Sequence, residues 1–297
     1  MVVFLEKGEE GFETTLKAIE KAELRKYIPD DRNVLIKPNL VTSAGSDEGI
    51  TTDVKVVEAV IHYLKENGIK NMVVGEGSGN NTYRSFERNG YSKLKEKYNV
   101  EILDLNKDNG ITSDVKNPIS INRIKVAELA YNSFRISVAK LKIHSIGVIT
   151  GTIKNMMGCL PGRNWKILIH SDIQNRLIDL AKVIMPDFGI IDGIVGNEVD
   201  EVVPRPVRMN IIIAGKDCVS VDSVSAEAMG VKWNEVPYLV LAEKEGLGIA
   251  NTSKIEIKGA KVEEVKKKFN RSKTLWSTIR TGTEIVYGKV IERVGIE

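Results

Sequence analysis

Two of the three histidines in the chain flank a lysine at short sequence separations. His144 precedes Lys154 by ten positions, and His170 follows Lys154 by sixteen. A neutral imidazole can transfer a proton near neutral pH or bind a metal, and a lysine shielded from water becomes a nucleophile when its pKa falls. These three residues are therefore predicted to carry chemistry, with acid–base, metal-binding and nucleophilic roles all open. The third histidine, His62, lies within a helical pattern and is expected to be structural.

Lys140 and Lys142 alternate with His144 along a predicted strand, which is an unusual pattern for a strand with apolar surroundings. Because successive side chains of a strand point to opposite faces, these three should point the same way. Lys154 and Asn155 follow on a short predicted helix. We predict that His144 and Lys154 are catalytic and that Lys142 and Asn155 bind the ligand or cofactor beside them.

Polar residues also follow two other predicted strands. Lys37 and Asn39 come directly after one strand and Asp192 ends another, which are positions at which α/β sheets bind ligands. Lys37 is predicted to clamp a phosphate or carboxylate, since an ammonium group attracts anions as a point charge. Asn39 and Asp192 are predicted to bind the same ligand or cofactor.

A glycine-rich loop, Gly75–Gly79, lies between a predicted strand and a predicted helix. Such a loop lets an anion approach backbone N–H groups, so Gly77, Ser78 and Gly79 are predicted to bind a ligand or cofactor. The loop lacks the third glycine of the dinucleotide fingerprint, and the chain has no Gly-x4-Gly-Lys-Ser/Thr motif. A flexible glycine turn is the alternative interpretation.

Apolar, β-rich runs alternate with amphipathic helical patterns, as in parallel sheets joined by helical crossovers. We predict a mostly parallel, doubly wound α/β sheet, and leave open whether a cleft divides it into two lobes. The predicted strands cover 34–36, 71–75, 100–105, 134–143, 189–192 and 208–214. The predicted helices cover 51–67, a broken helix at 84–98, 151–157, 172–184, 217–229 and 235–245, with a loop at 160–170. The expected N-caps are Thr51 or Thr52 for the first of these helices and Ser171 for the fourth.

The chain has 297 residues, of which 42% are hydrophobic and 28% are charged, as expected of a globular protein. Its net charge of +3 is unevenly distributed, because residues 266–297 hold eight basic and three acidic side chains. Residues 1–265 are therefore slightly acidic. We predict an α/β domain over 1–265 and a basic C-terminal extension over 266–297. The cations of the predicted site then favour a small anionic ligand over a polyanion.

Two cysteines, Cys159 and Cys218, are too few for a disulfide framework or for an iron–sulfur cluster held by one chain. No apolar run reaches the length of a transmembrane helix, and the first residues do not resemble a signal peptide. These features predict a cytoplasmic protein without a membrane segment. Cys159 is expected to be a small buried side chain and not a nucleophile.

An ordered set of short motifs lies between Val34 and Gly248. The motifs are 36–40 (IKPNL), 51–52 (TT), 75–79 (GEGSG), 140–144 (KLKIH), 154–158 (KNMMG), 160–162 (LPG), 191–193 (IDG), 214–217 (AGKD) and 221–222 (VD). This set resembles the family known as domain of unknown function 362. The resemblance implies an α/β fold, and members are often described as iron–sulfur proteins because many carry an added ferredoxin-like module, which is not seen in this sequence.

The chain is also remotely similar to the nickel-pincer lactate racemases, in which a catalytic histidine, a cofactor-bearing lysine and a nickel-ligating histidine follow one another. His144, Lys154 and His170 match this order and spacing. The resemblance implies that His144 is an acid–base group, that Lys154 anchors a pincer-type nucleotide, and that His170 is the metal ligand. The second acid–base histidine of those enzymes has no counterpart in residues 78–81, which read Ser-Gly-Asn-Asn. The fold and the site are therefore implied more strongly than racemisation.

Three functions remain open from the sequence. The first is an enzyme that binds a small anionic ligand or cofactor, as a racemase-like isomerase or a metal-dependent redox enzyme, with a nickel-pincer-type nucleotide or a divalent metal implied by the resemblance. The second is a non-catalytic redox or iron–sulfur accessory protein that shares Cys159 across a homodimer. The third is nucleic-acid binding by the basic tail, which we favour less than packing of the tail on the body or at a dimer interface.

Overall fold

The computed structural model describes residues 1–79, 81–272 and 275–294. Its centre is a nine-stranded sheet in the order β11-β1-β10-β9-β7-β2-β3-β4, with β8 paired to the end of β7. Five neighbouring pairs are parallel and three are antiparallel, which confirms the prediction of a mostly parallel sheet. The strands are β1 (Val2–Lys7), β2 (Val34–Pro38), β3 (Met72–Glu76), β4 (Glu101–Asp104), β7 (Phe134–His144), β8 (Val148–Thr150), β9 (Phe188–Asn197), β10 (Pro206–Gly215) and β11 (Glu256–Gly259).

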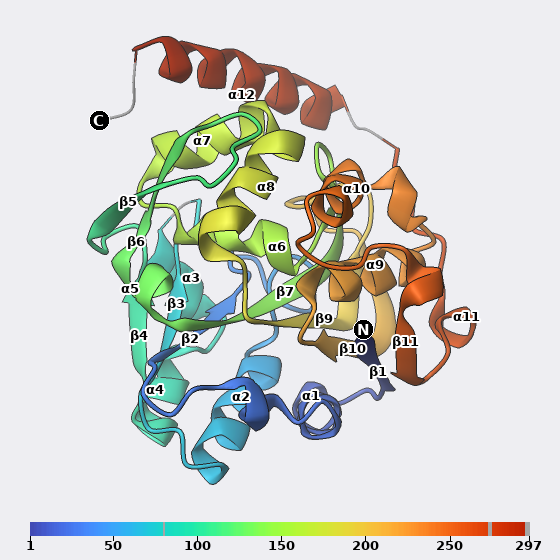
Figure 1. The fold of residues 1–297 in the computed structure, drawn as a ribbon. Helices are drawn as coiled ribbons and strands as arrows, with labels where there is room; N and C mark the ends of the chain where they lie inside the picture. Colours follow the sequence, from blue (N-terminus) through green and yellow to red (C-terminus); the bar gives the residue numbers. More distant parts are fainter. Residues whose placement is uncertain (80, 273–274, 295–297) are drawn as a thin grey trace.

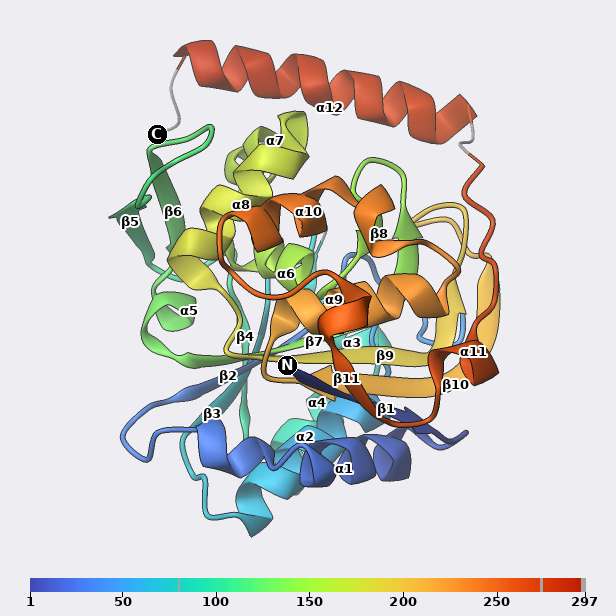
Figure 2. The same cartoon turned by 45° about the vertical axis from the view of Figure 1, so that its right-hand side comes forward.

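Helices cover both faces of the sheet, so that its central strands are buried on both sides (Figure 1, Figure 2). One layer contains α1 (Gly11–Lys21), α2 (Val54–Glu66) and α4 (Ser92–Tyr98), and the other contains α6 (Thr152–Asn155), α8 (Ile173–Ile184), α9 (Cys218–Ala228) and α10 (Pro237–Lys244). Each layer closes its own apolar cluster against the sheet. The doubly wound arrangement predicted from the alternating patterns is therefore present.

The remaining elements connect or flank these layers. They are η1 (Leu24–Tyr27), α3 (Thr82–Arg88), α5 (Glu128–Asn132), η2 (Met156–Cys159), α7 (Arg163–Ser171), η3 (Trp233–Glu235), η4 (Thr252–Lys254), α11 (Val262–Val265), α12 (Leu275–Val294), and a separate antiparallel pair of β5 (Gly110–Asp114) with β6 (Arg123–Ala127). None of the helices in the described ranges is long and apolar enough to cross a membrane.

Three local predictions are wrong. Residues 163–171 form the helix α7 and not a loop, and this helix begins after Gly162, whose φ of 72° suits a glycine that redirects the chain. The N-cap of α2 is Asp53, whose carboxylate accepts from Lys55 N, because the hydroxyls of Thr51 and Thr52 donate to the carbonyl oxygens of Ala44 and Val138 instead. Helix α8 begins after Asp172, because the hydroxyl of Ser171 donates to Leu168 O at the end of α7.

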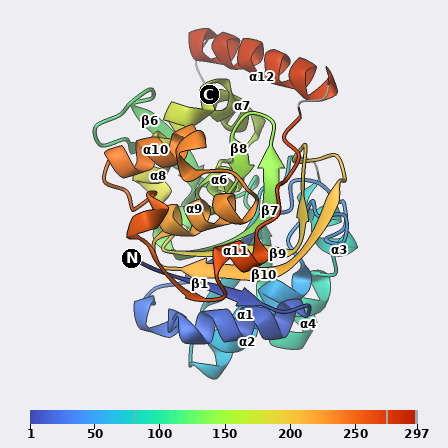
Figure 3. The same cartoon turned by 90° about the vertical axis from the view of Figure 1, so that its right-hand side faces the viewer.

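Helix α12, in the basic C-terminal extension, lies on α7 at the outer edge of the molecule (Figure 2, Figure 3). Gly288 sits so close to α7 that a Cβ atom there would lie 2.1 Å from Cβ of Ser171. Arg176 of α8 also pairs with Glu292 of α12 at 2.9 Å. The part of the tail that the structure describes thus packs on the body.

Candidate active site

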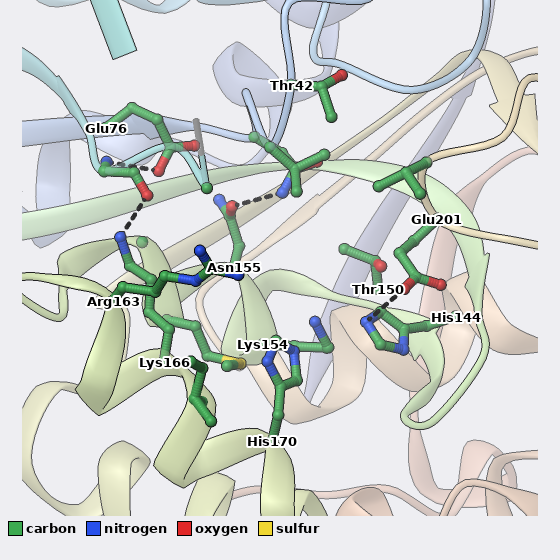
Figure 4. A pocket seen from close by; sticks show the side chains of 18 of the residues that line it. Thr42, Glu76, His144, Thr150, Lys154, Asn155, Arg163, Lys166, His170 and Glu201 are labelled. Carbon is green, nitrogen blue, oxygen red and sulfur yellow. Dashed lines mark hydrogen bonds and ion pairs between the residues drawn. The ribbon is translucent and has the colours of Figure 1, made fainter. Parts of the chain in front are cut away.

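A pocket of about 890 Å³ lies beyond the carboxyl ends of β2, β3 and β7 and is roofed by α7 and α12 (Figure 4). This volume is in the range of small-molecule sites, and its place is the one at which α/β sheets bind ligands. The structure brings most of the predicted site residues together in its wall. Those that line the pocket are Lys37, Asn39, Gly77, Gly79, Lys142, His144, Lys154, Asn155 and His170.

Asp192 and Ser78 are buried close to the pocket without lining it. The carboxylate of Asp192 accepts from Lys140 Nζ at 2.9 Å and from Asp53 N at 2.8 Å, so it ties β7 and the start of α2 to β9. The hydroxyl of Ser78 donates to Val41 O at 3.1 Å. The geometry therefore gives Asp192 a structural partner, and Lys140 does not contribute a cation to the pocket.

Lys37 is also held by the protein and not by the pocket. Its ammonium group donates to Pro38 O at 2.9 Å, to Glu76 Oε1 at 2.8 Å and to Asn155 Oδ1 at 3.1 Å. An ammonium group has three N–H donors, so these three bonds use all of them. The predicted anion clamp at Lys37 is therefore a buried ion pair that positions Glu76 and Asn155.

Lys142 lies in a different environment. Its ammonium group donates to two backbone carbonyls, Ile50 O at 2.7 Å and Glu201 O at 3.1 Å, and the side chain is 1% exposed. Burial lowers the pKa of Lys142 from 10.5 to about 7, with the nearby Glu201 carboxylate opposing the shift. One of its three N–H donors remains for a ligand in the pocket.

His144 is held in one tautomer by the turn that follows β7. Its Nδ1 accepts from Ile146 N at 3.0 Å and from Gly147 N at 3.1 Å, so the proton of the neutral ring is on Nε2. Nε2 faces Glu201 Oε1 at 3.6 Å (Figure 4). The ring of His170 stacks on that of His144 with centroids 5.9 Å apart, so α7 and β7 bring the two predicted imidazoles together.

Lys154 and Asn155 reach the pocket because α6 is anchored from below. Asp222 of α9 accepts from Thr152 N at 2.6 Å, from Thr152 Oγ1 at 2.7 Å and from Ile153 N at 3.2 Å. Burial raises the pKa of Asp222 to about 6, and these hydrogen bonds oppose the shift. Lys154 then lies between His144 and His170 in the pocket wall (Figure 4).

The glycine loop lines the pocket at Gly77 and Gly79, and it also holds a cation of α7. Gly77 N donates to Glu76 Oε1 at 2.8 Å and Ser78 N donates to Thr82 Oγ1 at 3.2 Å, so these two N–H groups are not directed at an anion in the pocket. Instead, the carbonyl oxygen of Gly77 accepts from Lys166 Nζ at 2.7 Å. The loop thus orients a cation from α7, and two of its amides are already used.

Sequence reasoning missed several polar residues of the pocket wall, among them two cations and two carboxylates. Arg163 and Lys166 were not predicted because residues 163–171 were expected to form a loop and not the helix α7. Glu76 lies in the glycine loop, for which only the residues from Gly77 to Gly79 were predicted to bind a ligand. Glu201 lies in the long connection after β9, and Thr150 on the short strand β8. The buried Thr150 hydroxyl has no hydrogen-bond partner in the part of the chain that the structure describes.

The described side chains do not form a site that could bind a metal ion or a cluster by themselves. Within residues 1–79, 81–272 and 275–294, no three His, Cys, Asp or Glu side chains gather closely enough to hold a metal ion. Cys159 is fully buried in the apolar core, and burial raises its pKa to about 12. A cluster shared through Cys159 across a homodimer therefore conflicts with the structure, because this sulfur does not reach the surface.

The sheet, its two helical layers and the cation-rich pocket at its carboxyl edge define a protein of the doubly wound α/β class. Within that class, the chain belongs to the family described as domain of unknown function (DUF362), whose sequence pattern matches residues 34–227. The motifs had suggested this family, and the match confirms it.

The proteins similar to the chain include a cyanobacterial protein and a lactate racemase. The thylakoid-associated protein sll1697 of Synechocystis sp. (strain ATCC 27184 / PCC 6803 / Kazusa) is 27% identical over 227 residues, which cover 74% of this chain and 69% of that protein. The solved structure of the lactate racemase apoprotein from Thermoanaerobacterium thermosaccharolyticum matches with a TM-score of 0.49 and 13% identity. That match covers 72% of this chain and 54% of the other, so the chain spans about half its length.

Proposed function

We propose that the protein is an enzyme that takes a proton from a carbon atom next to the carboxylate or carbonyl group of a small anionic substrate. The observation that carries this proposal is the pair of His144 Nε2 and Glu201 Oε1, 3.6 Å apart in the wall of a pocket that also presents Lys142, Lys154 and His170. A carboxylate base beside cations is the arrangement that such a reaction needs.

The hydrogen bonds of His144 support different roles for His144 and Glu201 in the proposed reaction. Two backbone N–H groups point at Nδ1, so this nitrogen is the acceptor of the ring and Nε2 is its donor. A neutral imidazole of this kind donates a hydrogen bond to a developing oxyanion. Glu201 is then the base, and its carboxylate is oriented by Ser145 N at 3.0 Å.

In the proposed step, the Glu201 carboxylate takes the proton and the electron pair of the C–H bond moves into the adjacent carbonyl or carboxylate group. The enolate oxygen that forms is stabilised by His144 Nε2–H, and the ammonium groups of Lys142 and Lys154 lower its energy. Return of the proton to the same carbon completes an exchange, and return to a neighbouring atom completes an isomerisation.

Exchange with solvent deuterium tests the proposal directly. Purified protein is incubated in D₂O with a panel of short 2-oxo and 2-hydroxy acids, and loss of the proton at the reacting carbon is followed by ¹H NMR. We expect exchange with the wild type, a loss of at least 100-fold in Glu201→Gln, and a wild-type rate in the control Glu256→Gln on the outer strand β11. Equal rates in Glu201→Gln and the wild type would contradict the role of Glu201.

A second candidate function is supported by the position of Lys154 between two imidazoles (Figure 4). A buried lysine at the wall of a large pocket fits the covalent anchor of a pincer-type nucleotide, and His170 fits its single protein metal ligand. Such a group would supply a hydride acceptor in place of a proton base. Intact mass and metal content of protein from its native host distinguish the two, because a bare mass without metal would exclude this candidate.

A further inference from the structure

The pocket has two polar ends. In Figure 4, Arg163 and Lys166 lie beside Glu76 on one side, whereas His144, Thr150 and Glu201 lie on the other. Lys154 and His170 lie between them. The proposed proton transfer uses the end at Glu201 and leaves the cations of α7 without a role.

Lys166 is a cation whose neighbours do not neutralise it. Its ammonium group donates to Gly77 O at 2.7 Å and to Asn106 Oδ1, which are both uncharged acceptors. No ion pair joins Lys166 to a carboxylate of the described residues, although the charge of the Glu76 carboxylate raises the pKa of Lys166. Burial lowers the pKa of Lys166 to about 8. Its third N–H donor is available to an anion in the pocket.

Arg163 lies on the same face of α7, three positions before Lys166. Its guanidinium group makes no hydrogen bond or ion pair with any side chain or backbone group in the described ranges, and it lines the pocket. A guanidinium group presents five donors in a fork that fits carboxylate or phosphate oxygens. Arg163 and Lys166 together therefore offer a fork and a point charge to one anionic group.

The glycine loop is shaped to hold Lys166 in this place. A Cβ atom at Gly77 would lie 2.4 Å from Gly158 O and 3.0 Å from Lys166 Nζ, so only glycine lets the ammonium group reach the loop. Asn106 completes the setting, since its side-chain amide also donates to Ser78 O at 3.0 Å. The position of the cation is thus determined by three separate segments of the chain.

We propose that Arg163 and Lys166 form a second anion subsite, and that the substrate is an acid with two anionic groups. One group, a carboxylate, binds at the reactive end beside Lys142, Lys154 and the Thr150 hydroxyl, which has no hydrogen-bond partner among the described residues. The other group, a carboxylate or a phosphate, binds at Arg163 and Lys166. The assignment of the reactive end rests on the proposed function.

Calorimetric titration at pH 7 with three probes tests the subsite. Glutarate and valerate have the same chain length but two and one carboxylates, and 4-phosphonobutyrate carries a phosphonate in place of the second carboxylate of glutarate. We expect one or both of the two-anion probes to bind at least tenfold more tightly than valerate. The preferred probe shows which anion the subsite takes.

Variants locate this preference. We expect Lys166→Met and Arg163→Gln each to reduce it at least threefold and the double variant to remove it, while valerate affinity stays within twofold. The exposed Lys254→Met is the matched control for loss of one positive charge and should keep the full preference. Glu201→Gln should also keep it, because it changes the other end of the pocket.

Three results would overturn the subsite: no binding of any probe, equal binding of valerate and both two-anion probes, or a preference that survives in the double variant. None of them depends on catalysis. Deuterium exchange of a one-carboxylate acid without a two-anion preference would overturn the subsite and leave the proton transfer. A two-anion preference without deuterium exchange on any acid would overturn the proton transfer and leave the subsite.

Discussion

Replacing Lys142 by Met should stabilise the protein at low pH and destabilise it at high pH. Lys142 is 1% exposed, and burial lowers its pKa from 10.5 to about 7. These values differ by about 3.5, and one pKa unit corresponds to about 1.4 kcal/mol, so the protonated amine costs about 5 kcal/mol in the folded state below pH 7. The variant avoids this cost but loses the hydrogen bonds to Ile50 O and Glu201 O, at about 1 kcal/mol each.

The sign follows from proton uptake. Between pH 7 and 10.5, Lys142 is neutral in the folded protein and charged in the unfolded chain, so wild-type stability rises with pH through this group. We expect Lys142→Met to be more stable than the wild type by about 3 kcal/mol at pH 6. It should be less stable by about 1 kcal/mol at pH 10, because the cost of the charge has then nearly vanished.

Urea unfolding at the two pH values measures this difference. The stability gap between variant and wild type should change by about 4 kcal/mol from pH 6 to pH 10. Lys140→Met is the control, because Lys140 pairs with the buried Asp192 at 2.9 Å and its loss should destabilise by several kcal/mol at both values. A gap for Lys142→Met that is the same at both pH values would refute the reasoning.

Three further predictions follow from the pocket and its roof. Thr150→Val should raise the free energy of unfolding of the ligand-free protein by about 1 kcal/mol in urea, because it removes a buried hydroxyl that has no partner among the described residues. The same variant should weaken glutarate binding about fivefold, and unchanged binding would contradict the role of this hydroxyl. Glutarate affinity measured by calorimetry should fall at least tenfold from pH 7 to pH 9, because Lys142 and Lys166 lose their protons with pKa values of about 7 and about 8; a constant affinity would show that neither binds the anion. Glu292→Gln should speed amide hydrogen exchange in residues 275–294 and leave exchange in β7 unchanged, because it breaks the ion pair between Glu292 and Arg176. This ion pair contributes less than about 1 kcal/mol, since Glu292 is exposed. Unchanged exchange in 275–294 would show that this pair does not hold α12.

The fold was predictable where local pattern and tertiary position agree. Strand β7 reads as one apolar run because it is buried on both faces, and the layer of α2 follows from its periodic valines. The prediction omitted β1, which pairs with β10 and with β11 from the far end of the chain. Such pairing depends on residues more than two hundred positions apart, and no local pattern records it.

The location of the site could be predicted from the sequence, but the ion pairs between its residues could not. Residues at strand ends, such as Lys37 and His144, do gather at one edge, because parallel strands end together. Which carboxylate meets which cation depends on distant segments: Lys37 meets Glu76 across 39 positions, and Lys140 meets Asp192 across 52. The alternating lysines therefore looked equivalent in the sequence although the structure separates them.

The buried lysines near the pocket differ in whether a carboxylate pairs with them. Lys37 and Lys140 have carboxylate partners and hold the sheet together, so an anion in the pocket would gain little from them. Lys142 and Lys166 donate their hydrogen bonds to neutral carbonyl oxygens, and the carboxylates of Glu201 and Glu76 offset only part of the cost of burying each charge. A buried charge of this kind reduces stability, and an anion bound next to it would restore the missing partner. The two lysines that destabilise the free protein are thus the two whose protonation a ligand would favour, and the pH dependence of binding and the pH dependence of folding should report the same groups.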